Sequence, residues 1–417
     1  MAPSSVVAEE RAVTATGDIV QKTPKRRWVS YIWDTFDKSP EERRLLFKLD
    51  LAILTFASLG YFIKYLDQIN INNAFVSGMK EDLGMYGNQL NYMQTCWTVG
   101  YVIGEIPSNV LLTRIRPRYW IPAMEVLVTM DDTDFFIVPM QYRYPVLCPT
   151  ILYCSKAVGD LEGGNVALSQ KRMQLEGRKN REPYTKSKLK KIFTSWHVYL
   201  LTVLYITFNN GGAGSQPVFQ QWLKASTNPK YSVGQINAYP TTTSAVQVVT
   251  TLAYAWSSDT FLNGKRWPPI IFGAIINIIC YVSLAVWDIP TGWKWTCFIL
   301  AGAGYGLSGL CMAWAHEICS EDNEERSLVI GSMNEMAYVF QAWLPQVVWQ
   351  QIDAPQYRKG YIAVTILSVI LIGTTVVIRE LDLREQVAKA KRRQVESEES
   401  IVEVEGGESG QEGPGKV

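Results

Sequence analysis

Three carboxylates stand inside or at the edge of long apolar runs: Asp67, Glu105 and Glu335. A charge in a lipid environment is costly, so such residues are functional candidates, and burial raises a carboxylate pKa toward the range that proton coupling needs. We predict these three as proton-coupling candidates. Lys64 precedes Asp67 by three residues, so a hydrated pair at the outer end of a helix is the alternative, and for Glu105 the alternative is a gating role.

Amides gather among glycines in a second candidate region. They are Asn209, Asn210, Gln216, Gln220 and Gln221, and Pro217 lies among them. Glycine and proline loosen a membrane helix, and the freed backbone groups together with amides can hydrogen-bond a polar solute. We predict a solute site here, with polar bonding between helices as the alternative. Close helix packing is the expected role of four other glycines, which are Gly302, Gly304, Gly306 and Gly309.

Several other classes of function have little support in the sequence. Two isolated histidines and seven cysteines without a CxxC pair predict no metal site, no cofactor and no enzyme active site, and we interpret the cysteines as packing residues. The net charge of +1 gives no reason to expect nucleic acid as a partner. No protein partner is implied either.

The elements that must position these residues are predicted membrane helices. About 20 apolar residues cross a bilayer as a helix. We predict an all-α, polytopic helical membrane protein with about eight spans, near residues 50–70, 89–113, 197–222, 236–257, 268–287, 295–316, 328–350 and 360–379.

The distribution of basic residues gives an orientation to these spans. With the N-terminus in the cytosol, 33 of the 40 Lys and Arg residues fall on the cytosolic side, six fall outside, and Lys64 lies within the first span. An excess of Lys and Arg marks cytosolic loops. We therefore predict a multi-pass protein with both termini in the cytosol, and the plasma membrane as its location.

Composition divides the chain into five segments. Segment 125–170 has apolar stretches that charges and prolines interrupt, and the residues that follow it are basic. The end of the chain is rich in Glu, Gly and Ser, which is typical of disorder. We predict a cytosolic segment 1–49, a partial half with two spans 50–128, an atypical segment and basic loop 129–195, a six-helix half 196–380, and a disordered tail 381–417.

Motifs in both halves resemble a known transporter family. The first half has Tyr65–Ala74 (YLDQININNA) and Gly104–Asn109 (GEIPSN), followed by Arg114 and Arg118. The second half has NNGGAGSQP from residue 209, WSSD from 256 with GKR from 264, and NEMA from 334 with QAWLP from 341. Together these resemble the major facilitator superfamily, in its fungal anion:cation symporter branch of allantoate, biotin and pantothenate permeases, with the pantothenate type as the nearest match.

The resemblance implies twelve spans in two six-helix halves, a solute site between the halves, and a cytosolic gate. It adds Asn334 and Gln341 to the predicted solute-binding residues. Asp259 with Arg266 resembles the loop motif in which an acid and an arginine tie neighbouring helices, and Arg114 and Arg118 stand at the first-half equivalent. The chain departs from the family after about residue 128, because spans three to six are not recognisable.

The sequence thus predicts a secondary active transporter, with proton-coupled uptake of a small carboxylate such as pantothenate or a related vitamin. Its partners would be an anionic solute, the proton and the lipid bilayer. One alternative is a truncated, transport-incompetent or regulatory membrane protein, because alternating access needs both halves. Another is a permease for allantoate or another organic anion.

Overall fold

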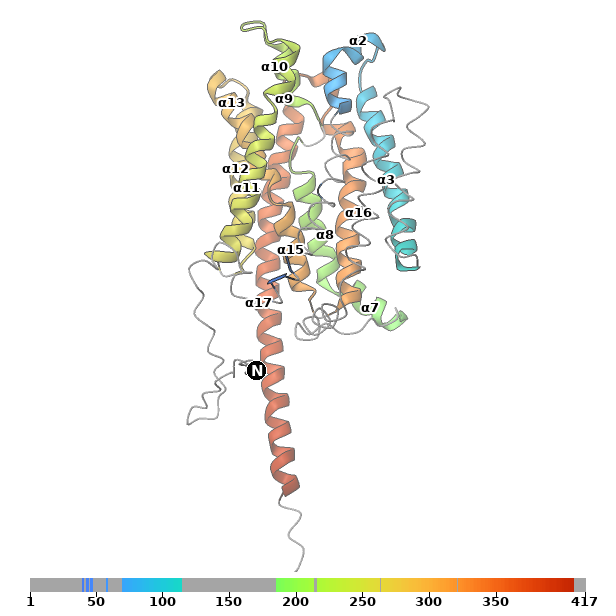
Figure 1. Cartoon of the computed structure of the whole chain (residues 1–417), viewed down its shortest axis with the longest axis vertical. Helices are drawn as coiled ribbons and strands as arrows, with labels where there is room; N and C mark the ends of the chain where they lie inside the picture. The colour runs from blue at the N-terminus through green and yellow to red at the C-terminus, as the bar shows by residue number, and fades with distance from the viewer. Residues whose placement is uncertain are drawn as a thin grey trace, which may run out of the picture.

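The computed structural model of the chain is a bundle of helices (Figure 1). The structure describes residues 70–114 and 185–408, apart from 214, 215, 263 and 321, with a few isolated positions before residue 60; side chains are described up to residues 104 and 391 of these two ranges. Within these residues every regular element is a helix and none is a strand, in agreement with the predicted all-α class.

The elements run from the N-terminal part to the long helix α17. They are η3 (Phe75–Met79), α2 (Lys80–Asp82), α3 (Gln89–Arg114), α7 (Lys186–Thr194), α8 (Trp196–Asn209), α9 (Val218–Ala225), α10 (Val233–Ala238), α11 (Thr241–Thr260), α12 (Trp267–Val286), α13 (Thr291–Leu300), α14 (Gly302–Tyr305), α15 (Ser308–Ile318), α16 (Asn323–Val348), η5 (Gln351–Asp353) and α17 (Arg358–Glu408). We call the end of the bundle with η3, α2, α9 and α10 the upper end, and the end with α7 the lower end (Figure 1).

Helices occupy seven of the eight predicted runs, and the first run, 50–70, lies almost wholly outside the described residues. Three helical stretches of the described part are long and apolar enough to cross a membrane: Trp267–Val286, Thr291–Ile318 and Arg358–Lys391. Apolar side chains such as Phe272 on α12 and Ile366 on α17 are exposed. Such exposed apolar faces are more favourable in contact with lipid than with water.

Polar caps mark where the helices of the lower end begin. The Asp322 carboxylate accepts hydrogen bonds from the backbone N–H groups of Glu324 and Glu325 at the start of α16, and the Ser195 hydroxyl accepts one from His197 N at the start of α8. A side-chain oxygen at this position satisfies amides that the first turn leaves unpaired. These caps fix where α8 and α16 begin, side by side.

Two apolar cores lie one above the other in the bundle. The lower core joins α8, α15, α16 and α17 through residues such as Leu204 and Met333, both fully buried. The upper core is rich in aromatic rings, and Phe219 of α9 stacks on Phe298 of α13 with 4.8 Å between ring centroids. The interrupted stretch between α8 and α9 therefore lies at the change from one core to the other.

Close helix packing explains three of the four predicted glycines. A Cβ on Gly302 would lie 2.3 Å from the Thr243 backbone oxygen of α11, and one on Gly304 would lie 2.4 Å from Asn277 Oδ1 of α12. A Cβ on Gly306 would come within 3.0 Å of two threonine hydroxyls, whereas none of the described residues lies within 4 Å of a Cβ on Gly309. The packing prediction is confirmed for Gly302, Gly304 and Gly306, and for Gly309 it stays a prediction.

The end of the chain differs from the sequence prediction in one respect. We predicted a disordered tail from residue 381, whereas α17 continues as a helix to Glu408. Oppositely charged side chains four residues apart line this stretch, with Arg384 on Glu380 and Lys389 on Glu385. Such pairs favour a helix, and the composition argument did not take this spacing into account.

Candidate functional site

The interrupted stretch between α8 and α9 is the centre of the candidate site. Its backbone groups are bonded by side chains of another helix: Asn277 Nδ2 donates to the Gly211 carbonyl oxygen at 2.6 Å, and the Ala213 N–H donates to Tyr281 Oη at 3.1 Å. Gly212 lies against the ring of Tyr305, which a Cβ would approach to 2.4 Å. The glycines therefore let α12 and α14 approach and stabilise a break in the helix.

Above this break, a chain of amides crosses from the N-terminal elements to the C-terminal ones. Gln94 Nε2 on α3 donates to Asn72 Oδ1 at 2.9 Å, and Gln216 Nε2 donates to Gln94 Oε1 at 2.9 Å. Gln351 Nε2 of η5 donates in turn to Gln216 Oε1 at 2.9 Å. We call Asn72, Gln94, Gln216 and Gln351, with their partners Gln221 and Tyr357, the amide network.

Gln351 is the branching point of the amide network. Its side chain also donates to Asn91 Oδ1 at 3.2 Å and accepts from Gln221 Nε2 at 2.6 Å. Tyr357 Oη lies within hydrogen-bonding distance of the oxygens of both Gln221 and Gln351. One neutral side chain thus joins α3, α9 and the start of α17.

Two further contacts close the upper end. Gln220 Nε2 donates to Asn73 Oδ1 at 2.6 Å, and Asn91 Nδ2 donates to the Trp349 carbonyl at 2.9 Å. Gln216, Gln220 and Asn91 are all buried. Buried amides that are paired in this way rigidify a contact between helices, because an unpaired amide there would be costly.

The remaining predicted solute-binding residues lie between α8 and α16. Asn209 Nδ2 donates to Gln341 Oε1 at 3.3 Å, and Asn210 Nδ2 donates to the carbonyls of Ile206 and Ala337. Asn334 is half-buried on the same helix as Gln341. The six predicted residues therefore divide into two sets, with Gln216 and Gln220 in the upper end and the other four along α8 and α16.

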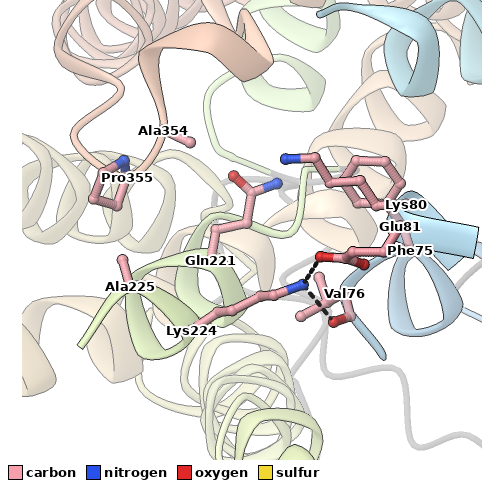
Figure 2. A pocket seen from close by; sticks show the side chains of 9 residues that line it. All are labelled: Phe75, Val76, Lys80, Glu81, Gln221, Lys224, Ala225, Ala354 and Pro355. Carbon is pink, nitrogen blue, oxygen red and sulfur yellow. Dashed lines mark hydrogen bonds and ion pairs between the residues drawn. The ribbon is translucent and has the colours of Figure 1, made fainter. Parts of the chain in front are cut away.

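A cavity of about 200 Å³ opens beside the amide network (Figure 2). Gln221 lines it together with Lys80, Glu81 and Lys224, and the rest of its wall is Phe75, Val76, Ala225, Ala354 and Pro355. Lys224 Nζ lies 2.8 Å from Glu81 Oε1 and 3.1 Å from the Val76 carbonyl oxygen. Two ammonium groups face one carboxylate, so the cavity favours an anion.

At the lower end, the predicted pair of Asp259 and Arg266 is in contact. Arg266 Nη1 lies 2.5 Å from Asp259 Oδ1, and Nη2 lies 2.8 Å from Glu317 Oε1 at the end of α15. The Arg266 side chain is mostly buried while both carboxylates are about half exposed. Arg266 thus ties the end of α11 to the end of α15, and Glu317 is a partner that the motif did not indicate.

A second ionic cluster joins α8, α16 and α17. His197 Nδ1 lies 2.6 Å from Glu325 Oε1, and His197 Nε2 lies 3.1 Å from Glu385 Oε2. Carboxylates accept hydrogen bonds, so both ring nitrogens carry a proton in this arrangement. The hydrogen bond from His197 lowers the pKa of the Glu325 carboxyl below its ordinary value. Nearby, burial and the two carboxylates raise the pKa of the Cys319 thiol to about 12.

Some predicted residues lie where the structure gives no side chain. Asp67 and Arg118 are outside the described residues, and Glu105 and Arg114 are described only as backbone of α3. Glu335 is half-buried on α16. Their predicted roles in proton coupling and gating remain predictions.

The candidate site also contains residues that the sequence analysis did not select: Asn72, Asn91, Gln94, Asn277, Gln351 and Tyr357. For the five Asn and Gln residues among them, the signal in the sequence was the residue type, because amides inside or just beside apolar runs need hydrogen-bond partners.

Comparison with known proteins gives relatives over most of the chain. It is 27% identical to the pantothenate transporter liz1 of Schizosaccharomyces pombe, across 84% of each chain. It is 26% identical to the MFS transporter PfmaC of Pestalotiopsis fici, across 79% of this chain and 78% of the relative. It is 21% identical to the vitamin H transporter of Saccharomyces cerevisiae, across 81% of this chain and 72% of that one.

No family model and no solved structure matches the chain. The relatives are named as transporters, which agrees with a multi-pass membrane protein built of helices long and apolar enough to cross a membrane. The chain is therefore similar, over about four fifths of its length, to fungal transporters.

Proposed function

We propose that this protein is a secondary active transporter that takes up a small carboxylate vitamin such as pantothenate, coupled to protons, across the plasma membrane. The observation that carries the proposal is the polar layer around the interrupted α8–α9 stretch, in a chain that is similar over most of its length to a pantothenate transporter. Transporters of this general kind bind solutes at broken helices between their two halves.

The chemistry of the site supports an anionic, hydrogen-bonding solute. Lys80 and Lys224 give the upper cavity a positive character, and amides from α3, α8, α9 and α16 offer both donors and acceptors beyond it. A solute with one carboxylate and several hydroxyl or amide groups would match this set. In this proposal Asn209, Gln341 and Asn334 hold the solute, while Gln216 and Gln220 belong to the upper closure.

In this proposal the two ends of the bundle act as gates. The amide network closes the upper end, which we assign to the outside, and Arg266 with its carboxylates holds the lower, cytosolic end. Glu335 is half-buried on α16 and follows Asn334 directly, so it is our first choice for the proton-coupling carboxylate, with Asp67 and Glu105 as the others. Both termini would then be cytosolic.

Uptake of labelled pantothenate tests the proposal. The full chain is expressed in yeast cells that lack their own pantothenate carrier, and its amount at the cell surface is measured in the same cells. We expect uptake above that of cells with an empty vector, and we expect the variant Gln341→Leu to reduce this uptake. No uptake from a chain that is present at the surface would refute the proposal.

A second candidate, a transport-incompetent membrane protein, is favoured by one observation. The alignment with the pantothenate transporter liz1 extends over 435 positions although it includes 84% of a chain of 417 residues. The aligned part of the relative therefore has residues that this chain lacks, which supports a shortened transporter as the alternative. Sequencing the transcript across residues 125–170 distinguishes a real truncation from an incomplete gene sequence.

A further inference from the structure

The lower end contains a group of side chains that the proposed solute site does not use. His197, Cys319 and Glu325 each offer one ligand atom, and these three atoms lie within 4.8 Å of one another. His197 and Cys319 are almost fully buried, with 6% and 3% of their surfaces exposed. The residues come from the start of α8, the end of α15 and the first turn of α16.

We propose that His197, Cys319 and Glu325 bind a divalent transition-metal ion of the zinc type. Imidazole nitrogen, thiolate sulfur and carboxylate oxygen are the three ligand types that zinc takes in proteins, and three protein ligands leave a fourth position for water. Ligand atoms around one tetrahedral ion lie about 3.5 Å apart. The widest spacing, at most 4.8 Å, would have to contract by up to about 1.3 Å, and the 2.6 Å between His197 Nδ1 and Glu325 Oε1 would have to widen by about 0.9 Å. Rotation of side chains at helix ends can supply both changes.

Glu385 provides the second feature that such sites have. Metal-bound histidines usually donate their other ring N–H to a carboxylate, which fixes the orientation of the ring. His197 Nε2 lies 3.1 Å from Glu385 Oε2, while His197 Nδ1 points toward Glu325. Nδ1 can therefore bind the ion while Glu385 orients the ring from α17.

Metal binding would change the protonation of the cluster. Glu325 and Glu385 bring two negative charges, which the His197 imidazolium and Lys389, whose Nζ lies 3.1 Å from Glu385, balance in the metal-free state. A metal ion would replace the proton on Nδ1 and the proton of the Cys319 thiol, as metal binding generally does. The bound ion would then join α8, α15 and α16 directly and α17 through Glu385.

Cys319 separates this proposal from a simple ion pair. The contacts of His197 with Glu325 and Glu385 need no cysteine, whereas a metal site loses a ligand without it. The test uses the full chain, purified in detergent and stripped with a chelator, and titrates it with Co²⁺ followed by Zn²⁺. Cobalt bound to a thiolate gives a charge-transfer absorption that cobalt bound only to nitrogen and oxygen lacks.

The wild-type chain is expected to bind one equivalent of Co²⁺ with this absorption, and Zn²⁺ should abolish it. Cys319→Ser should lose the absorption and bind Zn²⁺ at least about tenfold more weakly, on the scale of lost ligand-shell interactions. Cys311→Ser, at a fully buried cysteine of α15, is the matched control and should bind as the wild type does. Equal metal binding by the Cys319→Ser and wild-type chains, or no binding by either, would overturn the proposal.

Discussion

The upper and lower ends of the bundle are held together by different chemistry. At the upper end neutral amides bond to one another across α3, α9 and η5, with Gln351 at the branching point. At the lower end carboxylates meet Arg266, His197 and Lys188. Hydrogen bonds between neutral amide side chains are insensitive to pH and nearly insensitive to salt, whereas ion pairs respond to both. The two ends can therefore be loosened independently, as a carrier that opens alternately would require.

The largest effect is expected at the upper end. Gln351→Leu would remove the hydrogen-bond partner of three atoms, which are Asn91 Oδ1, Gln216 Oε1 and Gln221 Nε2. A buried polar atom without a partner costs about 1–3 kcal/mol, and two of the three belong to the buried residues Asn91 and Gln216, so the free energy of unfolding should fall by about 2–6 kcal/mol. Thermal unfolding in detergent measures this. The neighbouring variant Gln350→Leu, which loses only one bond to the Gln346 carbonyl, is the control, and an equal loss in both variants would contradict the role of Gln351.

Acid should weaken the lower end selectively. The hydrogen bond from His197 lowers the Glu325 pKa below its ordinary 4.5. A lowered carboxyl pKa contributes stability above the unfolded pKa, and this contribution is lost as the pH falls through the folded pKa. Glu325→Gln should therefore be less stable than the wild type at pH 7, by about 1–3 kcal/mol for a charged hydrogen bond.

The difference between these two chains should shrink as the pH falls below 4.5, while the difference between Gln351→Leu and the wild type stays constant. Unfolding temperatures measured across this range at constant salt give both comparisons. A Glu325→Gln effect that is independent of pH would show that the ion pair with His197 does not form.

Arg266 is expected to show a smaller effect because its partners are half exposed. Arg266→Ala removes contacts to Asp259 and Glu317, but water can solvate both carboxylates, so the loss should be about 1 kcal/mol. Arg266→Lys keeps the charge and loses the forked geometry that reaches two acids at once. It should recover less than half of the stability, and full recovery by lysine would show that only the charge matters.

The smallest effect is expected from the exposed pair of Lys224 and Glu81 at the cavity. Lys224→Met should change the free energy of unfolding by less than about 1 kcal/mol, and high salt should reduce the difference further. If the cavity attracts an anionic solute, the same variant should raise the solute concentration needed for half-maximal uptake. Glu81→Gln, which leaves the cavity more positive, should lower this solute concentration.

The sequence predicted the helices more fully than the site. Apolar runs gave α3, α8, α12, α16 and α17, because length and hydrophobicity act locally. It also selected Asn209, Gln216 and Gln220, since buried amides are costly. Their partners are far away in the chain: Gln216 bonds to Gln94, 122 positions earlier, and His197 meets Glu385, 188 positions later.

Such contacts depend on how the helices pack, which composition and spacing do not contain. Cys319 shows the same limit. The spacing of the cysteines gave no metal motif, and only folding brings Cys319 beside His197 and Glu325. The Gly302 and Gly304 prediction succeeded because small residues in a membrane helix have a general packing role.

Counterflow in proteoliposomes tests the central claim most directly. The purified chain is reconstituted, loaded with unlabelled pantothenate and diluted into labelled pantothenate, with panthenol, the alcohol that lacks the carboxylate, as competitor. The account predicts transient accumulation of label that external pantothenate inhibits, that panthenol leaves unchanged, and that Asn209→Leu reduces. Vesicles that contain the folded chain and accumulate no more label than empty vesicles would contradict it.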